Sequence, residues 1–381
     1  MKNDHEIKMM TPFTFLLIFF IGIGVILAFY RLANGLGATT NLNDDFPWGL
    51  WIGFDMLGGV AMAAGGFIVA GAVYLLNMKK YKPIVRPAVL TAFLGYLLAI
   101  IALMLDLGHP FRIWHPGFMW QVHSVMWVVA MHVIFYTMTL AIESSPMLFE
   151  KLKWQKAVDF VHKIIVPVVL FGVMLSVLHQ SSLGALYLIA QGKLSPLWSI
   201  GGFLPYMFLI SAVMMGLSMV SIESISSAKF FNHKLNFGIM YGLVRGTIVA
   251  LIIYLALKLY YLATGPGIGA IFAGTIEANM YLLEVIGGII LPLVILPSVR
   301  KKSDSTSGLV LGHTLVIGGV LVNRFNVSIS GLYGFQSATG SSYFPSLIEF
   351  LITLSLVALG IFVFKLTAKY LALFPDVEAE Y

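Results

Sequence analysis

The sequence predicts an all-α polytopic membrane protein, and three observations support that prediction. Hydrophobic residues make up 59% of the 381-residue chain and charged residues only 10%, whereas soluble domains average roughly 45–50% apolar and about 25% charged residues. Apolar stretches long enough to cross a bilayer recur along the whole chain. The Lys and Arg residues gather in alternate connecting segments, as they do in chains that cross a bilayer repeatedly.

The composition also excludes several kinds of cofactor and partner. The chain has no cysteine, so it forms no disulfide, holds no iron–sulfur cluster or zinc through thiolates, and attaches no c-type haem. Its net charge of +6 is spread over short loops rather than along one stripe, which argues against nucleic acid. Any electron carrier is therefore expected to be histidine-ligated, a bound organic molecule, or part of another subunit.

Ten stretches are long enough to span as helices, which need roughly 20 apolar residues each. The first begins at Pro12, is too long for the apolar core of a cleavable signal, and lacks an A-x-A site. Pro167 and Pro292 lie inside spans and predict kinks. The fifth and tenth spans are long enough to tilt or to extend past the bilayer. The spans are expected at about 12–31, 49–76, 86–107, 122–143, 160–190, 203–224, 239–263, 276–298, 308–328 and 346–372.

These spans are expected to form one integral membrane domain. Residues 12–31 form a peripheral helix, 49–190 a first four-helix bundle, 203–328 a second four-helix bundle and 346–372 the last helix. The sequence contains no long linker and no soluble domain.

The distribution of basic residues predicts the orientation of the chain. Seventeen of the 23 basic residues fall on one side, whereas the loops of the other side hold only Arg31, Arg112 and Lys193. The positive-inside rule then places both termini in the cytoplasm. The seventeen are Lys2, Lys8, Lys79, Lys80, Lys82, Arg86, Lys151, Lys153, Lys156, Lys163, Lys229, Lys234, Arg300, Lys301, Lys302, Lys365 and Lys369.

The loops of the opposite, outer side are rich in aromatic residues. They hold Phe46, Trp48, Trp114, Trp120, Trp198, Tyr343 and Phe344. One interpretation is an aromatic belt at the membrane interface. The other is a docking surface for a partner on that side.

Polar residues at membrane depth gather in the outer leaflet, where ionisable groups are costly and therefore candidates for function. A helical rise of about 1.5 Å per residue places side chains from four successive spans at a similar depth. Consecutive helices usually pack together, so we expect one pocket in the first bundle. Its residues are Asp55, Asp106, His109, Arg112, His123, His179 and Gln180.

A pocket of this composition suits a quinone. Quinone carbonyls need hydrogen-bond donors and a group that exchanges protons near neutral pH, which His supplies. The alternative is structural: Asp106 and Arg112 pair with each other, and the serines that follow Gln180 bond back to helix carbonyls.

A second set of ionisable residues lies deeper or in the later spans. Structural ion pairs are one interpretation of this set. The other is a proton-conducting chain between the quinone pocket and the cytoplasm, with Glu143 at its entry and His132 as a relay. The set comprises Glu143, His132, Glu223, Arg245, Lys258, Glu284 and Arg324.

Haem b is not expected in this chain. His123 and His179 have comparable depth and are the one candidate pair of axial ligands, whereas membrane cytochromes b usually offer paired histidines at two depths. The other intramembrane histidines give no matching second pair.

Several motifs resemble the NrfD/polysulfide-reductase-like membrane subunits, most closely the branch of the hydrogenase-2 membrane subunit and of high-molecular-weight cytochrome complexes. They are FPWGLWIGFD at 46–55, RPA at 86–88, HQSSLG at 179–184 with PLW at 196–198, and NRFN at 323–326. The resemblance covers nearly the whole chain, and the HQSS-x-G motif is specific to the family.

The resemblance implies a function. Such subunits bind menaquinone or ubiquinone near the outer face and carry no redox metal themselves. They dock a ferredoxin-like iron–sulfur subunit outside the cytoplasm, which connects them to a NiFe hydrogenase, a molybdoenzyme or a multihaem cytochrome. The family pocket corresponds to Asp55, Asp106, His109, Arg112, His123 and His179.

One departure concerns the proton route. Hydrogenase-type relatives often carry an acid early in span four, in a pattern like SVLFE, whereas this chain reads SVMWV at 124–128. Glu143 does match a family acid. The departure leaves energy conservation by this subunit an open question.

The sequence therefore predicts the quinone-reactive membrane anchor of a respiratory oxidoreductase in a bacterial or archaeal plasma membrane. Two alternatives stay open: a secondary transporter of a small solute or ion, and an anchor without quinone chemistry. Transporters commonly show repeats and interrupted helices near the midplane, whereas the polar cluster here lies toward one surface.

Overall fold

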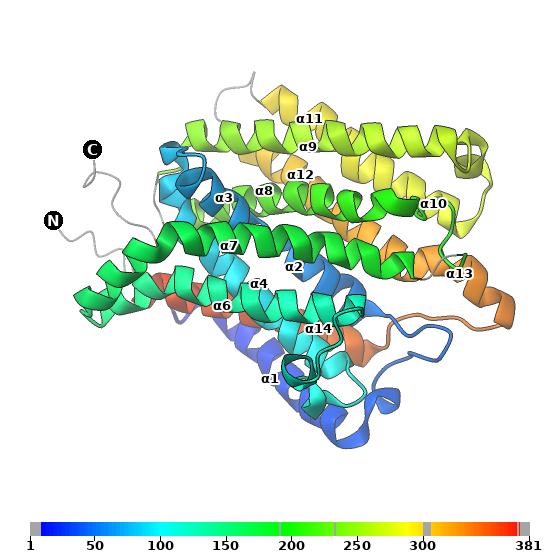
Figure 1. Cartoon of the computed structure of the whole chain (residues 1–381), viewed down its shortest axis with the longest axis horizontal. Coiled ribbons are helices and arrows are strands. Elements are labelled where there is room, and N and C mark those ends of the chain that lie inside the picture. Colours follow the sequence, from blue (N-terminus) through cyan, green and yellow to red (C-terminus); the bar gives the residue numbers. More distant parts are fainter. Residues whose placement is uncertain (1–8, 190–191, 232–233, 300–305, 372, 374–381) are drawn as a thin grey trace.

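The computed structural model describes residues 9–189, 192–231, 234–299, 306–371 and 373. Within these ranges, ten helices are long and apolar enough to cross a membrane, which confirms the predicted fold class (Figure 1). Five basic residues used to orient the chain, Lys2, Lys8, Arg300, Lys301 and Lys302, lie outside the described residues. The assignment of the two sides to cytoplasm and exterior therefore stays a prediction.

The ten spans have the following bounds. They are α1 (Pro12–Asn34); η2, α2 and α3 (Trp51–Gly58, Gly59–Met62, Gly65–Tyr74); η3 and α4 (Lys79–Ile84, Val85–Asp106); α6 (Val125–Lys151); α7 (Gln155–Leu188); α8 (Leu204–Phe230); α9 (Phe237–Thr264); α10, η7 and α11 (Ile276–Leu282, Leu283–Ile290, Leu291–Val299); α12, η8 and α13 (Thr306–Phe325, Asn326–Ser330, Gly331–Gln336); and α14 (Leu347–Tyr370).

The spans begin where the sequence offers a cap or a proline. Side chains of Thr11, Ser124, Asn236, Thr275 and Ser346 each accept a hydrogen bond from a backbone N–H in the first turn that follows. Such caps satisfy donors that have no partner inside the helix. The capped starts lie within three residues of the predicted ones, whereas several boundaries without a capping side chain differ by one or two turns. For example, α6 continues to Lys151 rather than ending near 143, and α7 begins at Gln155 rather than near 160.

The helices pack in two rings. In one ring α3 contacts α4 and α7, and α6 contacts α4 and α7; in the other, α12 contacts α8 and α11, and α9 contacts α8 and α11. Helices α1 and α14 lie side by side next to α4 (Figure 1). One buried hydrophobic cluster extends through both rings, as expected of one integral membrane domain.

The start of α1 and the end of α14 lie at the same end of the molecule. Lys365, near the end of α14, donates a 2.6 Å hydrogen bond to Thr14 Oγ1, near the start of α1. An even number of crossings requires this arrangement, and it brings a basic residue to the side that the charge pattern assigns to the cytoplasm.

Three spans contain π-helical segments that hydropathy did not predict. They are η2, η7 and η8, and they carry Asp55, Glu284 and Asn326, respectively. The second span is also interrupted by a turn at 63–64. Since π-bulges insert an extra residue and often occur at functional sites, these segments mark the parts of the fold that position polar side chains.

We predict that the contact of η7 with α12 tolerates no added side chain. A Cβ on Gly319 would clash with the backbone of Gly288, whereas a Cβ on the adjacent Gly318 meets no atom within 4 Å. Gly319→Ala should lower the free energy of unfolding by about 2 kcal/mol, the range expected of overpacking. The measurement is the thermal midpoint of the detergent-solubilised protein, with Gly318→Ala as the matched control. Equal midpoints for the two variants would contradict this packing.

Candidate functional site

Asp55 lies buried in η2, close to the outer end of the second span. Its side chain is 8% exposed and accepts a 2.6 Å hydrogen bond from Thr353 Oγ1 of α14. The π-helical segment turns Asp55 toward α14 rather than toward the ring of helices that follows. The last helix therefore forms part of the site, which the depth argument did not predict.

Asp106 ends α4 and lies within electrostatic range of Asp55. The nearby cation is Arg31 at the end of α1, which donates hydrogen bonds of 2.5 and 2.6 Å to the carbonyls of Leu105 and Leu107. A cation stabilises the C-terminal end of a helix, where unpaired carbonyls gather. Arg112, expected as a structural partner of Asp106, is instead exposed on η4 (Pro110–Arg112).

Glu349 supplies a third carboxylate near Asp106. It belongs to a capping box: Ser346 Oγ accepts from the Glu349 backbone N–H, and the Glu349 carboxylate accepts from the Ser346 N–H at 2.8 Å. Tyr343 donates a 2.5 Å hydrogen bond to the same carboxylate, and burial together with this bond raises the pKa of the Tyr343 hydroxyl. The S-x-x-E pattern at 346–349 was the sequence signal for this residue.

His179 lies fully buried inside the first ring, away from these carboxylates. Its ring centroid is 5.6 Å from that of Tyr96 and 6.5 Å from that of His132, and neither of its nitrogens has a hydrogen-bond partner within the described residues. The adjacent Gln180 donates a 3.0 Å hydrogen bond to the Val60 carbonyl, which ties α7 to the irregular second span.

The remaining outer candidates lie on the surface. His109, Arg112 and His123 are exposed in the segment between α4 and α6. The structure thus distributes the predicted pocket over three places: the Asp55–Asp106 pair, the interior around His179, and an exposed loop. Their roles in quinone binding stay predictions.

The same loop exposes several aromatic side chains. Trp114 and Trp120 are 53% and 68% exposed, and Phe111 and Phe118 are exposed further. Trp198, in contrast, is fully buried. The loop aromatics are therefore available to a membrane interface or to a partner, whereas Trp198 is part of the core.

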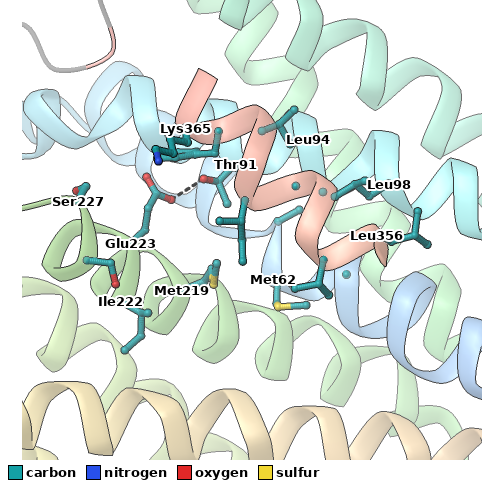
Figure 2. A pocket seen from close by; sticks show the side chains of 18 of the residues that line it. Met62, Thr91, Leu94, Leu98, Met219, Ile222, Glu223, Ser227, Leu356 and Lys365 are labelled. Carbon is teal, nitrogen blue, oxygen red and sulfur yellow. Dashed lines mark hydrogen bonds between the residues drawn. The ribbon is translucent and has the colours of Figure 1, made fainter. Parts of the chain in front are cut away.

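A cavity of 1040 Å³ extends inward from Asp55. It lies between the second span, α4, α8 and α14, and Phe13 of α1 lies at its edge. Most of its wall is apolar, and Figure 2 shows Met62, Leu94, Leu98, Met219 and Leu356 on it.

The inner end of the cavity is polar. There, Thr91 donates a 2.6 Å hydrogen bond to Glu223, and Lys365 lies nearby (Figure 2). The cavity thus has a carboxyl group at each end and an apolar wall between them.

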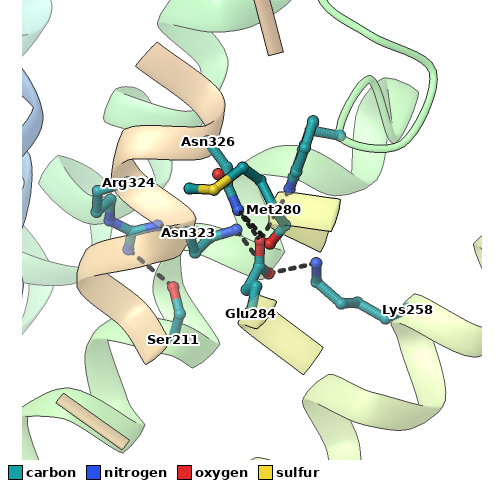
Figure 3. A network of polar contacts seen from close by, with 8 residues as sticks. Ser211, Lys258, Met280, Glu284, Asn323, Arg324 and Asn326 are labelled. Atoms are coloured by element: carbon teal, nitrogen blue, oxygen red, sulfur yellow. Dashed lines mark hydrogen bonds and ion pairs between the residues drawn. The ribbon is translucent and has the colours of Figure 1, made fainter. Parts of the chain in front are cut away.

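A buried ion-pair network occupies the second ring (Figure 3). Lys258 forms an ion pair with Glu284 of η7, and the Glu284 carboxylate also accepts from Asn323, Asn326 and Trp198 at 2.9–3.0 Å. Burying a carboxylate is costly unless all of its acceptor sites are used. Glu284 meets this requirement.

Arg324 extends this network toward α8. It donates to Asn323 Oδ1 at 2.9 Å and to Ser211 Oγ at 2.8 Å, and its guanidinium lies 3.8 Å above the Phe208 ring. The arrangement resembles a structural core network more than a chain of proton carriers. Arg245, by contrast, is exposed on α9 and does not join it.

A column of buried hydroxyl groups lies between Glu143 and His179. A Cβ on Gly172 would lie 3.0 Å from Glu143 Oε1 and 3.6 Å from the Tyr136 ring. The Glu143 carboxyl group and the Tyr136 ring therefore both pack against Gly172. The Tyr136 and Tyr96 rings are 4.7 Å apart, and Tyr96 contacts His179.

Sequence reasoning missed the middle of this column. Ser176 lies beside both tyrosine hydroxyls, yet Tyr96, Tyr136 and Ser176 make no hydrogen bond of ordinary geometry within the described residues. Isolated Tyr and Ser residues in an apolar span carry no charge signal. Only their mutual placement shows that they form a set.

Metal ligands do not gather anywhere in the described ranges. No group of three or more His, Asp or Glu side chains there has the geometry to hold a metal ion.

Comparison with family models identifies the family of this ten-span chain. The model of the family described as polysulphide reductase, NrfD, matches residues 38–335. The chain belongs to the NrfD family. It is a multi-pass integral membrane protein of the plasma membrane, of the kind that serves quinone oxidoreductase complexes.

Three relatives align over nearly their full length. A protein of Nitratidesulfovibrio vulgaris is 37% identical, with 95% of this chain and 94% of the relative covered. The probable Ni/Fe-hydrogenase 2 b-type cytochrome subunit of Escherichia coli is 33% identical, with 94% of this chain and 91% of the relative covered. The menaquinone reductase integral membrane subunit of N. vulgaris is 31% identical over 98% and 93%. Because one relative is named a b-type cytochrome, the absence of haem from this chain stays a prediction.

We predict that removing the charge of Glu284 destabilises the protein more than removing the charge of Lys258. Glu284→Gln leaves Lys258 without a counter-charge and should lower the free energy of unfolding by about 3–5 kcal/mol. Lys258→Met should cost less, because three N–H donors still satisfy Glu284. Thermal midpoints of both variants and of the double variant form the test. A double variant that loses the full sum of the single losses would contradict the coupling.

Proposed function

We propose that this chain is the quinone-reactive subunit of a multisubunit respiratory oxidoreductase. It exchanges electrons between the membrane quinone pool and an iron–sulfur subunit on the extracytoplasmic side. The observation that carries the proposal is the large, mainly apolar cavity with the buried Asp55 at one end and Asp106 within electrostatic range of Asp55. A membrane quinone needs this combination of an apolar space and a nearby proton-exchanging group.

The chemistry of the site follows from these two carboxyl groups. A quinone that is bound and reduced takes up two electrons and two protons. Asp55, positioned by Thr353, is the group that exchanges a proton at the cavity, and Asp106 is placed to pass one to or from it. Arg31 fixes the end of α4 and so holds Asp106 at this depth.

The electrons are proposed to come from, or go to, a partner. The segment between α4 and α6 presents Trp114, Trp120 and Arg112 to the outside, and a ferredoxin-like subunit that docks there would bring its cluster close to the Asp55 end of the cavity. The catalytic subunit behind it is a NiFe hydrogenase, a molybdoenzyme or a multihaem cytochrome. The menaquinone reductase relative supports menaquinone over ubiquinone.

We further propose that protons from the cytoplasm enter the first ring and move through it as far as His179. Buried polar atoms without protein partners are usually satisfied by internal water. Waters between Glu143, Tyr136, Ser176 and Tyr96 would complete a path toward His179 and His132. This route uses the two ionisable residues of the first ring that the sequence assigned to proton transfer, whereas Lys258, Glu284 and Arg324 stabilise the second ring.

Asp55→Asn should slow quinone-linked turnover of the native complex about 100-fold, because the amide cannot exchange the proton. The assay is steady-state turnover of the purified complex with a short-chain quinone analogue, with dye-linked activity of the catalytic partner as the check on assembly. Asp44→Asn is the matched control, since Asp44 is an exposed acid of the outer loop. Unchanged turnover in a fully assembled Asp55→Asn complex would refute the assigned role.

Tyr136→Phe should lower the number of protons taken up from the inner side per electron transferred, because it removes one hydroxyl from the column. The measurement is the pH change inside proteoliposomes that contain the complex. Tyr206→Phe serves as control, since Tyr206 is 61% exposed. If proton uptake per electron stays the same, the path does not pass through Tyr136.

A further inference from the structure

The second span is broken between α2 and α3, where Ala63 and Ala64 form a turn. At this turn the Ala64 N–H donates to the carbonyl of Ala61, three residues back. In a continuous α-helix it would donate to the carbonyl of Val60, four residues back. The break therefore takes the Val60 carbonyl out of the backbone hydrogen bonding of its own span.

A carbonyl freed at membrane depth needs a donor from another part of the chain. The bilayer core has no water to supply one, and an unpaired backbone group there costs free energy. Gln180 of α7 supplies the donor: its side chain is fully buried, and its Nε2 donates to the Val60 carbonyl at 3.0 Å. Because this amide occupies the acceptor that the Ala64 N–H would otherwise use, it stabilises the broken form of the span over the continuous form.

The two sides of the break are held differently. On the side of α3, the backbone packs directly on α8, since a Cβ on Gly65 would lie 2.8 Å from the Gly216 carbonyl oxygen. On the other side, a Cβ on Gly59 would meet no atom within 4 Å. A change at the break is therefore taken up on the side of Gly59 and of η2, which carries Asp55.

The break also sets the direction in which Asp55 points. A turn with hydrogen bonds three residues back advances about 120° per residue, and an α-helical turn about 100°. Closing the break would therefore rotate η2 relative to α3 by roughly 20° for each residue that changes. The 2.6 Å hydrogen bond from Thr353 Oγ1 to Asp55 tolerates little rotation, because hydrogen bonds weaken steeply with misalignment.

We propose that Gln180 is a positioning residue for Asp55: its hydrogen bond to the Val60 carbonyl keeps the second span broken, and the broken span holds Asp55 against Thr353. The inference rests on the proposed function, in which Asp55 exchanges the proton. It gives Gln180 an indirect role through the backbone of another helix, in place of direct contact with the quinone.

The test removes the donor and keeps the volume of the side chain. Gln180→Met is unbranched and similar in size, but a thioether cannot donate to the Val60 carbonyl. Gln180→Asn keeps an amide that is one methylene shorter, and it replaces the methionine variant if that variant fails to assemble. Ser182→Ala is the matched control, because Ser182 lies in the same turn of α7 and its hydroxyl donates to the Leu178 carbonyl of its own helix.

The measurement is steady-state turnover of the assembled complex with a short-chain quinone analogue, with dye-linked activity of the catalytic partner as the check on assembly. We expect Gln180→Met and Gln180→Asn to lower kcat about tenfold or more, since a misplacement of about 1 Å can cost a factor on the order of 100. The KM for the quinone should stay within about twofold, because no quinone contact is lost. In an Asp55→Asn background, Gln180→Met should lower kcat no further, since two changes that act through one group are not additive. Ser182→Ala should match the wild-type complex in both constants.

Three outcomes would overturn the inference. A wild-type kcat in the assembled Gln180→Met complex would show that the hydrogen bond to Val60 does not position Asp55. A raised KM at unchanged kcat would make Gln180 a direct ligand of the quinone. An equal fall of kcat in the wild-type and Asp55→Asn backgrounds would mean that Gln180 acts independently of Asp55. Full turnover of the Asp55→Asn complex, or none in the wild-type complex, would instead refute the proposed function on which the inference rests.

Discussion

Carboxylates at membrane depth are the constraint on which the rest of this structure depends. A carboxylate in a low-dielectric interior costs several kcal/mol unless cations and N–H or O–H donors surround it. Glu284 has an ion pair and three donors, and Glu349 has a capping serine and a tyrosine. Each set of donors comes from different parts of the chain, so satisfying one carboxylate fixes how those segments meet.

Asp55 and Asp106 are satisfied less completely than these structural acids. The hydrogen bond from Thr353 reaches one oxygen of Asp55, and one oxygen of Asp106 has no hydrogen-bond partner within the described residues. The contrast separates carboxylates that hold the fold together from carboxylates that remain available for chemistry. Arg31 fits this contrast. It donates to backbone carbonyls at the end of α4, so it stabilises this helix end and leaves the Asp106 carboxylate available.

Much of the fold followed from the sequence because hydropathy and charge act over whole spans. About 20 apolar residues per crossing and alternation of basic loops are properties of long segments, and the ten spans were predicted on that basis. The helix ends without a capping side chain, such as the end of α6 and the start of α7, were predicted less well, since hydropathy changes only gradually there. Glu349 was not predicted as part of the site, although its capping box is visible in the sequence.

The candidate site could be predicted from the sequence only in part. Depth along a helix places a residue at a level of the membrane, but it does not say which way the side chain points. Asp55, Asp106 and His179 lie toward the same ends of their spans, yet Asp55 faces α14 while His179 faces Tyr96. The partners of Asp55 come from the opposite end of the chain, and no local pattern encodes that contact.

The π-helical segments have a consequence for how this family varies. A π turn contains one residue more than an α turn, so the helix beyond it is rotated by about 100° relative to an uninterrupted helix. Deleting a single residue from η2 would therefore leave the apolar length of the span almost unchanged but turn either Asp55 away from Thr353 or α3 away from α4 and α7. Gaps of one residue inside a transmembrane helix, which length and hydropathy tolerate, are thus the changes by which a relative would lose or reposition this acid.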